Sequence, residues 1–516
     1  MRIGIDVGGT NTDAVLLDAH GDIVASVKRP TSDDIETGVV AALHAVLDGH
    51  DPGTVELAML GTTQCTNAVV ERRGLRRVGV LRIGAPATTA VPPLADWPDD
   101  LREAVLADAR VIRGGHHYDG REISPLDLDA VRAAARDWAG RVEAVAVTGV
   151  FSPANPEHEK RAAALLAELV TVPVSVSHEV GSMGLLEREN ATVLNAALTG
   201  VARRATGGFV RALAAAGVPA TGYLSQNDGT LMTMRQAVDY PVRTVASGPT
   251  NSLRGGALLS GRQDAVVIDV GGTTADFGAL GGGFPRESGV AVDVGGVVTN
   301  FRMPDLVSIG IGGGTVVRGT GRDARLGPDS VGHEITHRAL CFGGDTLTLT
   351  DVAVAAGFDL GDGAAVRARL DGAAATATLE VAEHQLTVAL DRIRTSAEPV
   401  TVIAVGGGSF LVPDRLTGAA EVLRPAHHEV ANAVGAAIAE VSGEVDRVFR
   451  LDGAAREEVV ERARSQAHAR AVAAGADPDT VREIDFEEIQ LAYLPGNAVR
   501  IRARAAGRLR GTGGRS

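Results

Sequence analysis

Two short segments of this chain combine a carboxylate, paired glycines and hydroxyl side chains in the same order. The first is Ile3-Gly4-Ile5-Asp6-Val7-Gly8-Gly9-Thr10-Asn11-Thr12-Asp13, and the second is Val267-Ile268-Asp269-Val270-Gly271-Gly272-Thr273-Thr274-Ala275-Asp276. In each segment an apolar run typical of a β-strand leads to an aspartate and then to a Gly-Gly-Thr turn. Glycines let backbone amides approach an anion closely, and nearby hydroxyls donate to phosphate oxygens. The pattern therefore predicts phosphate binding.

The duplication predicts two related halves that hold one nucleotide between them. A carboxylate at the end of a strand can hold a divalent cation directly or through water, as nucleotide-bound Mg²⁺ prefers. Asp6 and Asp269 occupy that position in their segments. A further buried-strand pattern, residues 402–405, ends in the triple-glycine turn Gly406-Gly407-Gly408. Three such turns favour a nucleotide site over a duplicated fold that has lost its ligand.

Other nucleotide-binding loops do not match the sequence. A Walker-type loop needs Gly-Lys followed by Ser or Thr, but the only two lysines are Lys28 and Lys160, and neither follows a glycine. A dinucleotide fingerprint places its glycines between a strand and a helix, whereas here the Gly-Gly-Thr turn leads into another strand pattern. Hydride-transfer chemistry is therefore disfavoured.

Composition narrows the class of protein. A chain of 516 residues exceeds what one hydrophobic core usually supports, so two or more domains are expected. The net charge of −14 argues against a nucleic-acid-binding surface. Cys65 and Cys341 are the only cysteines, which excludes a disulfide framework and favours a reducing compartment. Without a signal-peptide pattern or a bilayer-length apolar run, we expect a soluble, cytoplasmic protein with no membrane or nucleic-acid partner.

Hydrophobic patterning predicts an α/β protein in four parts. Residues 1–86 show three strands, a helix, a strand, a helix and a strand, which indicate a mixed sheet flanked by helices. Residues 87–255 are expected to form an intervening α/β region that completes the N-terminal domain, with a β-α-β unit near 142–176. Residues 256–445 are expected to be the second half, ending in a helix over 429–441. Residues 446–516 are expected to be a helical and strand extension with a basic, frayed tail from Arg500.

Longer segments carry a family resemblance. The two Asp-x-Gly-Gly-Thr segments and the Gly406–Gly408 turn look like the phosphate and adenosine motifs of the actin, sugar-kinase and heat-shock-chaperone ATPase superfamily. Within it the chain resembles the hydantoinase A and oxoprolinase family over most of its length. The segments that carry this resemblance are Gly61–Gly74, Asn155–Glu159, Ser177–Val180, Glu187–Ala196, Gln226–Gly229, Ala246–Pro249 and Ser308–Gly314.

The resemblance implies a fold and an activity. The fold would be a duplicated actin-like, ribonuclease H-like ATPase with mixed sheets flanked by helices and an inserted α/β region. Family members couple ATP cleavage to attack on a small cyclic amide or imide, so this chain would be the A-type component of an ATP-dependent hydrolase that uses ATP and Mg²⁺. A separate B-type subunit is expected because there is no room for a full B-type region after Val441. The assembly would be a homo- or hetero-oligomer.

The implied chemistry is phosphorylation of the amide oxygen. An amide carbonyl is a poor electrophile, and phosphorylation turns its oxygen into a good leaving group for attack by water. Such a transfer needs mainly a metal ion, positioning and charge stabilisation. Asp6 and Asp269 would organise Mg²⁺, and Asp13 and Asp276 would orient water or the acceptor. The nucleotide would be held by Gly8, Gly9, Thr10, Asn11 and Thr12, by Gly271, Gly272, Thr273 and Thr274, and by Gly406, Gly407 and Gly408.

Three other functions share these motifs. Carboxylase relatives of the acetone or acetophenone type contain the same ATP-cleaving half and act on ketones. A small-molecule kinase would release a phosphorylated product, although the sequence has no recognisable sugar-kinase substrate motif. A non-catalytic nucleotide switch would bind ATP without turnover, because one fold serves many functions.

Polar residues outside these motifs have ordinary structural interpretations as well. The adjacent pairs His116-His117 and His427-His428 would diverge on a strand, so solvated loops are favoured over metal sites. His178-Glu179, and Glu187 with Asn195, either line a substrate cleft or lie at the polar ends of elements. The sequence favours neither alternative for these last residues.

Overall fold

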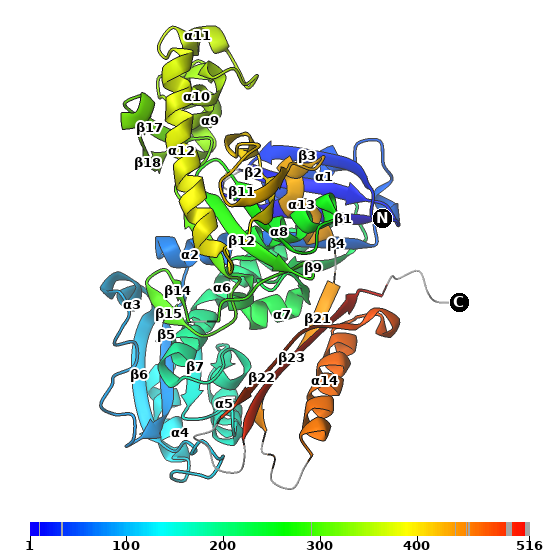
Figure 1. Ribbon diagram of the computed structural model, residues 1–516. Helices are drawn as coiled ribbons and strands as arrows, with labels where there is room; N and C mark the ends of the chain where they lie inside the picture. Colours follow the sequence, from blue (N-terminus) through cyan, green and yellow to red (C-terminus); the bar gives the residue numbers. More distant parts are fainter. Residues whose placement is uncertain are drawn as a thin grey trace.

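Three sheets organise the computed structural model of this protein (Figure 1). They have nine, six and four strands within the described residues, and two small hairpins accompany them. No described helix is long and apolar enough to cross a lipid bilayer. The structure describes residues 1–9, 11–31, 35–289, 291–438, 440–449, 451, 455–491 and 498–510.

The nine-stranded sheet contains the first glycine segment. Strand β1 pairs antiparallel with β2, so that Asp6 lies opposite Asp13, and parallel with β4, so that Asp6 lies beside Gly61. Helices α1 and α6 cover one face of these strands and α13 covers the other, which is why their apolar runs are nearly continuous. In sheet order the strands are β22 (Arg482–Gln490), β23 (Val499–Arg508), β21 (Glu440–Phe449), β10 (Leu231–Thr233), β9 (Thr221–Ser225), β4 (Leu57–Thr62), β1 (Arg2–Val7), β2 (Asn11–Leu17) and β3 (Ile23–Pro30).

The six-stranded sheet repeats this arrangement around the second glycine segment. Strand β11 pairs antiparallel with β12, so that Asp269 lies opposite Asp276, and parallel with β19. Helices α10 and α12 pack on one face and α8 on the other. The sequence repeat is therefore also a structural repeat. The strands are β13 (Phe284–Pro285), β12 (Ala275–Gly281), β11 (Ala265–Val270), β19 (Val400–Val405) and β20 (Ala419–Leu423), with β16 (Leu306–Ile309) paired to β12.

The four-stranded sheet is parallel throughout and belongs to the intervening region. The predicted β-α-β unit is present, because α5 connects β7 to β8. The strand predicted near residue 78 lies here, paired with β6 and β7, and not in the sheet of the first half as its position in the chain suggested. The strands are β6 (Leu106–Arg113), β5 (Val78–Ala85), β7 (Ala144–Gly149) and β8 (Val174–Val176); the small hairpins are β14 (Val292–Val294) with β15 (Val297–Thr299), and β17 (Thr315–Arg318) with β18 (Arg325–Ser330).

Helix α6 joins the inserted sheet to the first half. Its N-terminal part packs against β5 and β7, and its C-terminal part packs under β1, through Phe209 among others. The described α-helices are α1 (Ile35–Val46), α2 (Gln64–Glu71), α3 (Asp99–Val105), α4 (Leu128–Trp138), α5 (Glu157–Leu169), α6 (Leu185–Ala215), α7 (Met234–Asp239), α8 (Ser247–Ser260), α9 (Ile335–Arg338), α10 (Leu349–Ala355), α11 (Gly363–Arg367), α12 (Gly372–Ile393), α13 (Ala431–Ala437) and α14 (Arg456–Ala473).

Helices α8 and α13 cross each other between the two halves. A Cβ atom at Gly255 would overlap the carbonyl oxygen of Ala431, and one at Gly435 would overlap the carbonyl oxygen of Asn251. The two contacts are reciprocal, because each glycine stands four residues after the residue that the other one touches. Glycine at both positions lets the backbones meet directly, and this brings polar side chains of each helix to the opposite half.

The C-terminal region differs from its prediction. Residues 446–449 belong to strand β21, and the helix expected over 429–441 is only Ala431–Ala437. The segment predicted as a frayed basic tail is mostly strand β23, which lies between β21 and β22. Its arginines are held by acids on other segments, including Arg500 with Asp446. Residues 511–516 lie outside the described residues.

We propose four parts close to those expected from the sequence. By chain position, residues 1–86 and 87–255 form the N-terminal half. Residues 256–445 form the second half, and residues 446–516 form the extension. In space the boundary at residue 86 falls directly after β5, whose neighbours belong to the inserted sheet. Strands β9 and β10 return to the first sheet, and β21 begins before residue 446 and joins it beside β10.

Candidate functional site

The two Gly-Gly turns are closed by equivalent backbone hydrogen bonds. The N–H of Gly8 donates to the carbonyl of Asn11 at 3.0 Å, and the N–H of Gly271 donates to the carbonyl of Thr274 at 2.9 Å. Each turn closes an antiparallel pair whose two aspartates lie opposite each other. Thr10 lies outside the described residues. The two turns are thus equivalent, as a duplicated phosphate-binding element requires.

The first pair of carboxylates is buried and hydrogen-bonded from the second half. Asp6 and Asp13 are 3% and 1% exposed. Asn432, on α13, donates from Nδ2 to Asp6 Oδ2 at 3.0 Å and to Asp13 Oδ2 at 2.9 Å. Lys28 Nζ lies 2.8 Å from the same Asp13 oxygen, and Asn251 Nδ2 lies 3.2 Å from Asp6 Oδ1. The Asn432 amide therefore joins the two carboxylates of the first half, and Asn251 reaches Asp6 from α8.

The second pair is bonded by hydroxyl groups. Ser252, on α8, donates to Asp269 Oδ2 at 2.6 Å, and the Ser308 hydroxyl donates to Asp276 Oδ1. Ser252 belongs to the helix that follows the inserted region, so the second half also receives a side chain from the first. Because α8 and α13 cross between the halves, Asn432 on α13 bonds the first pair and Ser252 on α8 bonds the second.

The carboxylates raise one another's pKa. Burial is the largest cause for Asp6, and with the charge of Asp13 it raises the pKa of Asp6 to about 6. Burial, then the charge of Asp269, raises the pKa of Asp276 to about 7. The pKa values of Asp13 and Asp269 are also raised, chiefly by burial. Because Asp269 acts on Asp6, and Asp13 on Asp269, the four groups form one electrostatic cluster.

A divalent cation fits this cluster. Asp13 Oδ1 is buried without a hydrogen-bond partner among the described residues. Hard cations prefer carboxylate oxygens, and a cation would favour the ionised forms that burial disfavours. Space is kept for the carboxylates by glycines, since a Cβ atom at Gly61 would overlap Asp6 Oδ1 and one at Gly406 would overlap Asp269 Oδ1. The carboxylates at the two turns are thus of the ligand type that a magnesium ion prefers.

Two glycine loops support the second turn. The N–H of Gly408 donates to the carbonyl of Val270 at 2.7 Å. From the Ser308–Gly314 segment, Gly313 donates to Gly271 at 3.0 Å and Gly314 donates to Gly272 at 2.7 Å. The Gly406–Gly408 turn and the Ser308–Gly314 segment thus lie directly against the second Gly-Gly turn.

The residues predicted to bind the nucleotide differ in their exposure to solvent. Thr12 is 1% exposed, and its hydroxyl lies 3.4 Å from that of Thr31. Gly9 and Thr273 are exposed. The sequence reasoning missed Asn432, Asn251 and Ser252, which hydrogen-bond the aspartates. Their only sequence signal is a glycine four residues after Asn251 and after Ala431, in helices rich in small residues.

The family-like segments of the inserted region form a second buried network. Glu159, on α5, is fully buried and accepts from the N–H of Gly149 at 2.6 Å and from His178 Nδ1 at 2.6 Å. Arg188 donates to Ser177 Oγ at 2.9 Å. These bonds fix His178 directly after β8, the last strand of the four-stranded sheet. Asn195 is buried and bonds Ser175 Oγ at 3.0 Å, so it is not a surface residue.

His116 was wrongly assigned to a solvated loop. It is 1% exposed and its ring packs on that of His158, with centroids 4.2 Å apart. His117 beside it is exposed, as expected. His158 lies 42 positions later on another element, so the contact between the two rings carries no local sequence signal.

Comparison with known proteins identifies the family. The pattern of the hydantoinase/oxoprolinase N-terminal region matches residues 2–170, and the hydantoinase/oxoprolinase pattern matches residues 188–358. The chain belongs to the hydantoinase/oxoprolinase family. The family resemblance predicted from the sequence is therefore confirmed, and the two Asp-x-Gly-Gly-Thr segments of this family member lie in matched regions.

Two curated relatives illustrate the range of this family. The chain is 30% identical over 391 residues to caprolactamase subunit alpha of Pseudomonas jessenii, which covers 70% of the chain and 55% of the relative. It is 28% identical over 395 residues to the acetophenone carboxylase gamma subunit of Aromatoleum aromaticum, covering 69% and 53%. The chain thus spans about half the length of these relatives. One relative is named as a lactamase subunit and the other as a carboxylase subunit.

A solved structure shares the fold. The ATP-dependent caprolactamase from Pseudomonas jessenii matches 99% of this family member and 88% of its own chain, with a TM-score of 0.79 and 22% identity. At that identity the likeness concerns the fold. The predicted α/β architecture, with mixed sheets and two related halves, is confirmed.

Proposed function

We propose that this chain is the nucleotide-using A-type component of an ATP-dependent hydrolase that activates a small cyclic amide or imide for ring opening. The observation that carries the proposal is the cluster of Asp6, Asp13, Asp269 and Asp276 at two equivalent Gly-Gly turns. Asn432 bonds the first pair, and the neighbours Asn251 and Ser252 on α8 bond Asp6 and Asp269. Such a cluster supports binding of a nucleotide with its cation. The likeness to caprolactamase subunit alpha supports an amide as the substrate.

The proposed chemistry assigns a role to each group. When bound, ATP would supply the phosphoryl group and Mg²⁺ would offset the phosphate charge. Asp6 and Asp269 would hold the cation, and the backbone amides of residues 8–12 and 271–274 would face the phosphates. Asp13 and Asp276 would orient water or the accepting oxygen, and the cation would favour their ionised forms. Gly406–Gly408 would border the nucleotide.

The partners are part of the proposal. We propose a cytoplasmic assembly in which a separate B-type subunit completes the hydrolysis and the subunits form a homo- or hetero-oligomer. The relatives are named as subunits, which supports a partner.

Phosphate release tests the proposal. The purified chain with Mg²⁺ and ATP is assayed against hydantoins, oxoproline and lactams, with and without a candidate B-type subunit. Substrate-stimulated release that falls at least about 100-fold in Asp269→Asn is the expected result. The exposed change Asp22→Asn is the matched control. Stimulated release that persists in Asp269→Asn would contradict the assignment of this residue.

A carboxylase subunit is the second candidate. It is favoured by the likeness to the acetophenone carboxylase gamma subunit. Both reactions begin with ATP cleavage, so phosphate release does not separate them. Labelled bicarbonate does, because a carboxylase places the label in an acid-stable product when a ketone is supplied, and a hydrolase gives a ring-opened, unlabelled product.

A further inference from the structure

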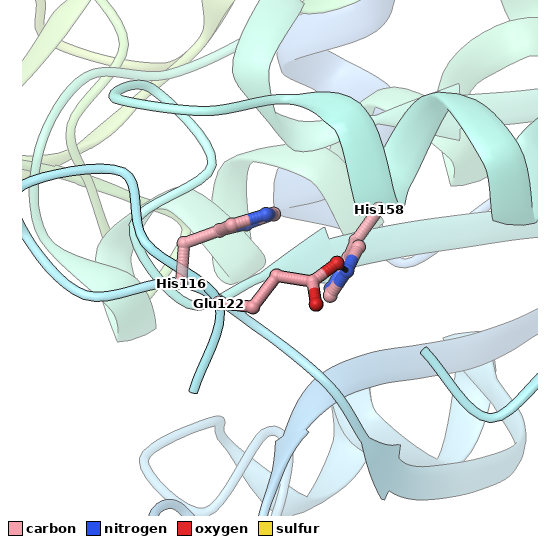
Figure 2. A group of neighbouring side chains, drawn as sticks. All are labelled: His116, Glu122 and His158. Carbon is pink, nitrogen blue, oxygen red and sulfur yellow. Dashed lines mark hydrogen bonds and ion pairs between the residues drawn. The ribbon is translucent and has the colours of Figure 1, made fainter. Parts of the chain in front are cut away.

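Three side chains of the inserted α/β region lie close to one another and are not part of the aspartate cluster (Figure 2). His116 and Glu122 face each other across an isolated antiparallel bridge in the loop after β6, and His158 is on the first turn of α5. One ligand atom from each residue lies within 4.8 Å of those from the other two. His116 and His158 are each 1% exposed, whereas the Glu122 side chain is 51% exposed. The cluster is thus buried on its imidazole side and open at its carboxylate.

His116 supplies an unused nitrogen. Its Nε2 atom is buried and has no hydrogen-bond partner within the part of the chain that the structure describes. A buried polar atom without a partner is costly, and native proteins rarely keep one without a reason. An imidazole nitrogen that is buried and has no partner can serve as a metal ligand.

His158 holds the carboxylate in place. The N–H of Gly115 donates to His158 Nδ1 at 3.0 Å, so the neutral ring carries its proton on Nε2, which lies 2.9 Å from Glu122 Oε1. This bond holds the pKa of Glu122 below its usual range. The loop that carries Glu122 is itself fixed, because Asn155 Nδ2 donates to the carbonyl of Gly120 at 2.9 Å. Hydrogen bonds to the neighbouring backbone therefore hold His158 and the loop that carries Glu122 in place.

We propose that His116, Glu122 and His158 bind one divalent transition-metal ion of the zinc type. Two imidazoles and one carboxylate favour such an ion over Mg²⁺, which prefers oxygen ligands. Binding through His158 Nε2 moves the ring proton to Nδ1, and the Gly115 N–H then loses its acceptor. The half-exposed Glu122 provides the route of entry. The site shares no residue with the aspartate cluster and does not depend on the proposed function.

Zinc binding by the full chain tests this site. The untagged protein is stripped with EDTA, desalted and titrated with Zn²⁺ by calorimetry in excess Mg²⁺, and bound zinc is counted by mass spectrometry of the metal. One equivalent is expected in the unaltered protein and in Asp269→Asn, which separates this site from the nucleotide centre. Visible absorption of bound Co²⁺ reports nitrogen ligation independently.

Variants locate the ion. His116→Ala and Glu122→Gln are expected to weaken zinc binding at least about 100-fold, since even outer-shell changes cost 10–100-fold. His117→Ala, at the adjacent exposed position, should bind as the unaltered protein does. Glu122→Gln keeps size and shape, so it remains informative if His116→Ala does not fold. Lack of a saturable equivalent in the unaltered chain, or undiminished binding in both ligand variants, would overturn the proposal.

Discussion

Asp276 illustrates how a single carboxyl group couples stability to pH. An ordinary Asp ionises near 3.8, whereas burial and the charge of Asp269 raise the pKa of Asp276 to about 7. Between these values the folded protein holds a proton that the unfolded chain has released. Protonation therefore stabilises the fold fully below pH 4, and this contribution is lost as the pH rises through 7. Asp6, with a pKa of about 6, acts in the same direction.

We predict that Asp276→Asn flattens the pH dependence of stability without nucleotide or metal. In the unaltered protein the free energy of unfolding should fall by roughly 2 kcal/mol from pH 4.5 to pH 7.5 because of this group, after allowance for its partial exposure. Asn does not ionise, so that part of the decrease should disappear. Urea unfolding at several pH values measures it, with Asp22→Asn as the control. An unchanged slope in Asp276→Asn would show that the group ionises normally.

Helices α8 and α13 carry the contact between the halves. Their backbones meet at Gly255 and Gly435, and a methyl group at either position would overlap a carbonyl oxygen of the other helix. Neither carbonyl is on a flexible side chain, so the helices have to move apart. Because α13 packs on the sheet that carries Asp6 and α8 packs on the sheet that carries Asp269, separation would withdraw Asn251 of α8 from Asp6. The packing of two glycines thus determines the geometry of the aspartate cluster.

We predict that Gly255→Ala and Gly435→Ala each lower the free energy of unfolding by about 3 kcal/mol or more. The matched control is Gly207→Ala in α6, where the added Cβ would meet only the end of the Arg211 side chain at 3.4 Å. Alanine there should be neutral or stabilise by up to about 1 kcal/mol through helix propensity. Chemical unfolding of the three variants provides the comparison. A loss at Gly207 equal to that at Gly255 would mean that helix crossing is not the cause.

Local elements were predictable where local chemistry determines them. Helix α5 begins and ends where expected, because Asn155-Pro156 precedes a run of helix formers and Val170 begins an extended segment. The Asp-x-Gly-Gly-Thr turns were equally clear, since glycine spacing and strand patterning lie within a dozen residues. The prediction was incomplete for β23: a strand was expected in this extension, but its alternating arginines look like a basic tail. Their partners, Asp446 and Glu287 among them, are distant in sequence.

The candidate site was predictable only in its repeated parts. Both aspartate pairs follow from the strand registers, but Asn432 reaches Asp6 from 426 positions away. His116 likewise contacts His158 only because the inserted sheet brings β6 and α5 together. Such partners depend on tertiary packing, which hydrophobic periodicity does not encode. Local patterns therefore identified the phosphate turns, and the structure was required to identify what holds them together.

At the scale of the whole molecule, the extension ties the chain's end to both halves. Strand β21 joins the sheet of the first half beside β10. Glu440, at its start, accepts from Arg254 of α8 at 2.7 Å and from Arg482 of β22 at 2.6 Å. Arg254 and Glu440 are buried, so this pair fixes the extension against the crossing helices. A change in the angle between the halves would therefore be transmitted to the extension.

A nucleotide held by both halves should stabilise them as one unit, and the stabilisation should depend on the cation. Four clustered carboxylates repel a triphosphate, so ATP without Mg²⁺ should shift the melting temperature little. At about 100 times its Kd, the Mg²⁺ complex adds about 2.7 kcal/mol, or a few degrees. Asp6→Asn and Asp269→Asn lie on different halves. Each should remove most of the Mg²⁺-dependent shift, whereas Asp22→Asn should keep it. Thermal melts with ATP, with and without Mg²⁺, make the comparison. If only one of the two variants lost the shift, the nucleotide would contact a single half, and the duplicated turns would not act together.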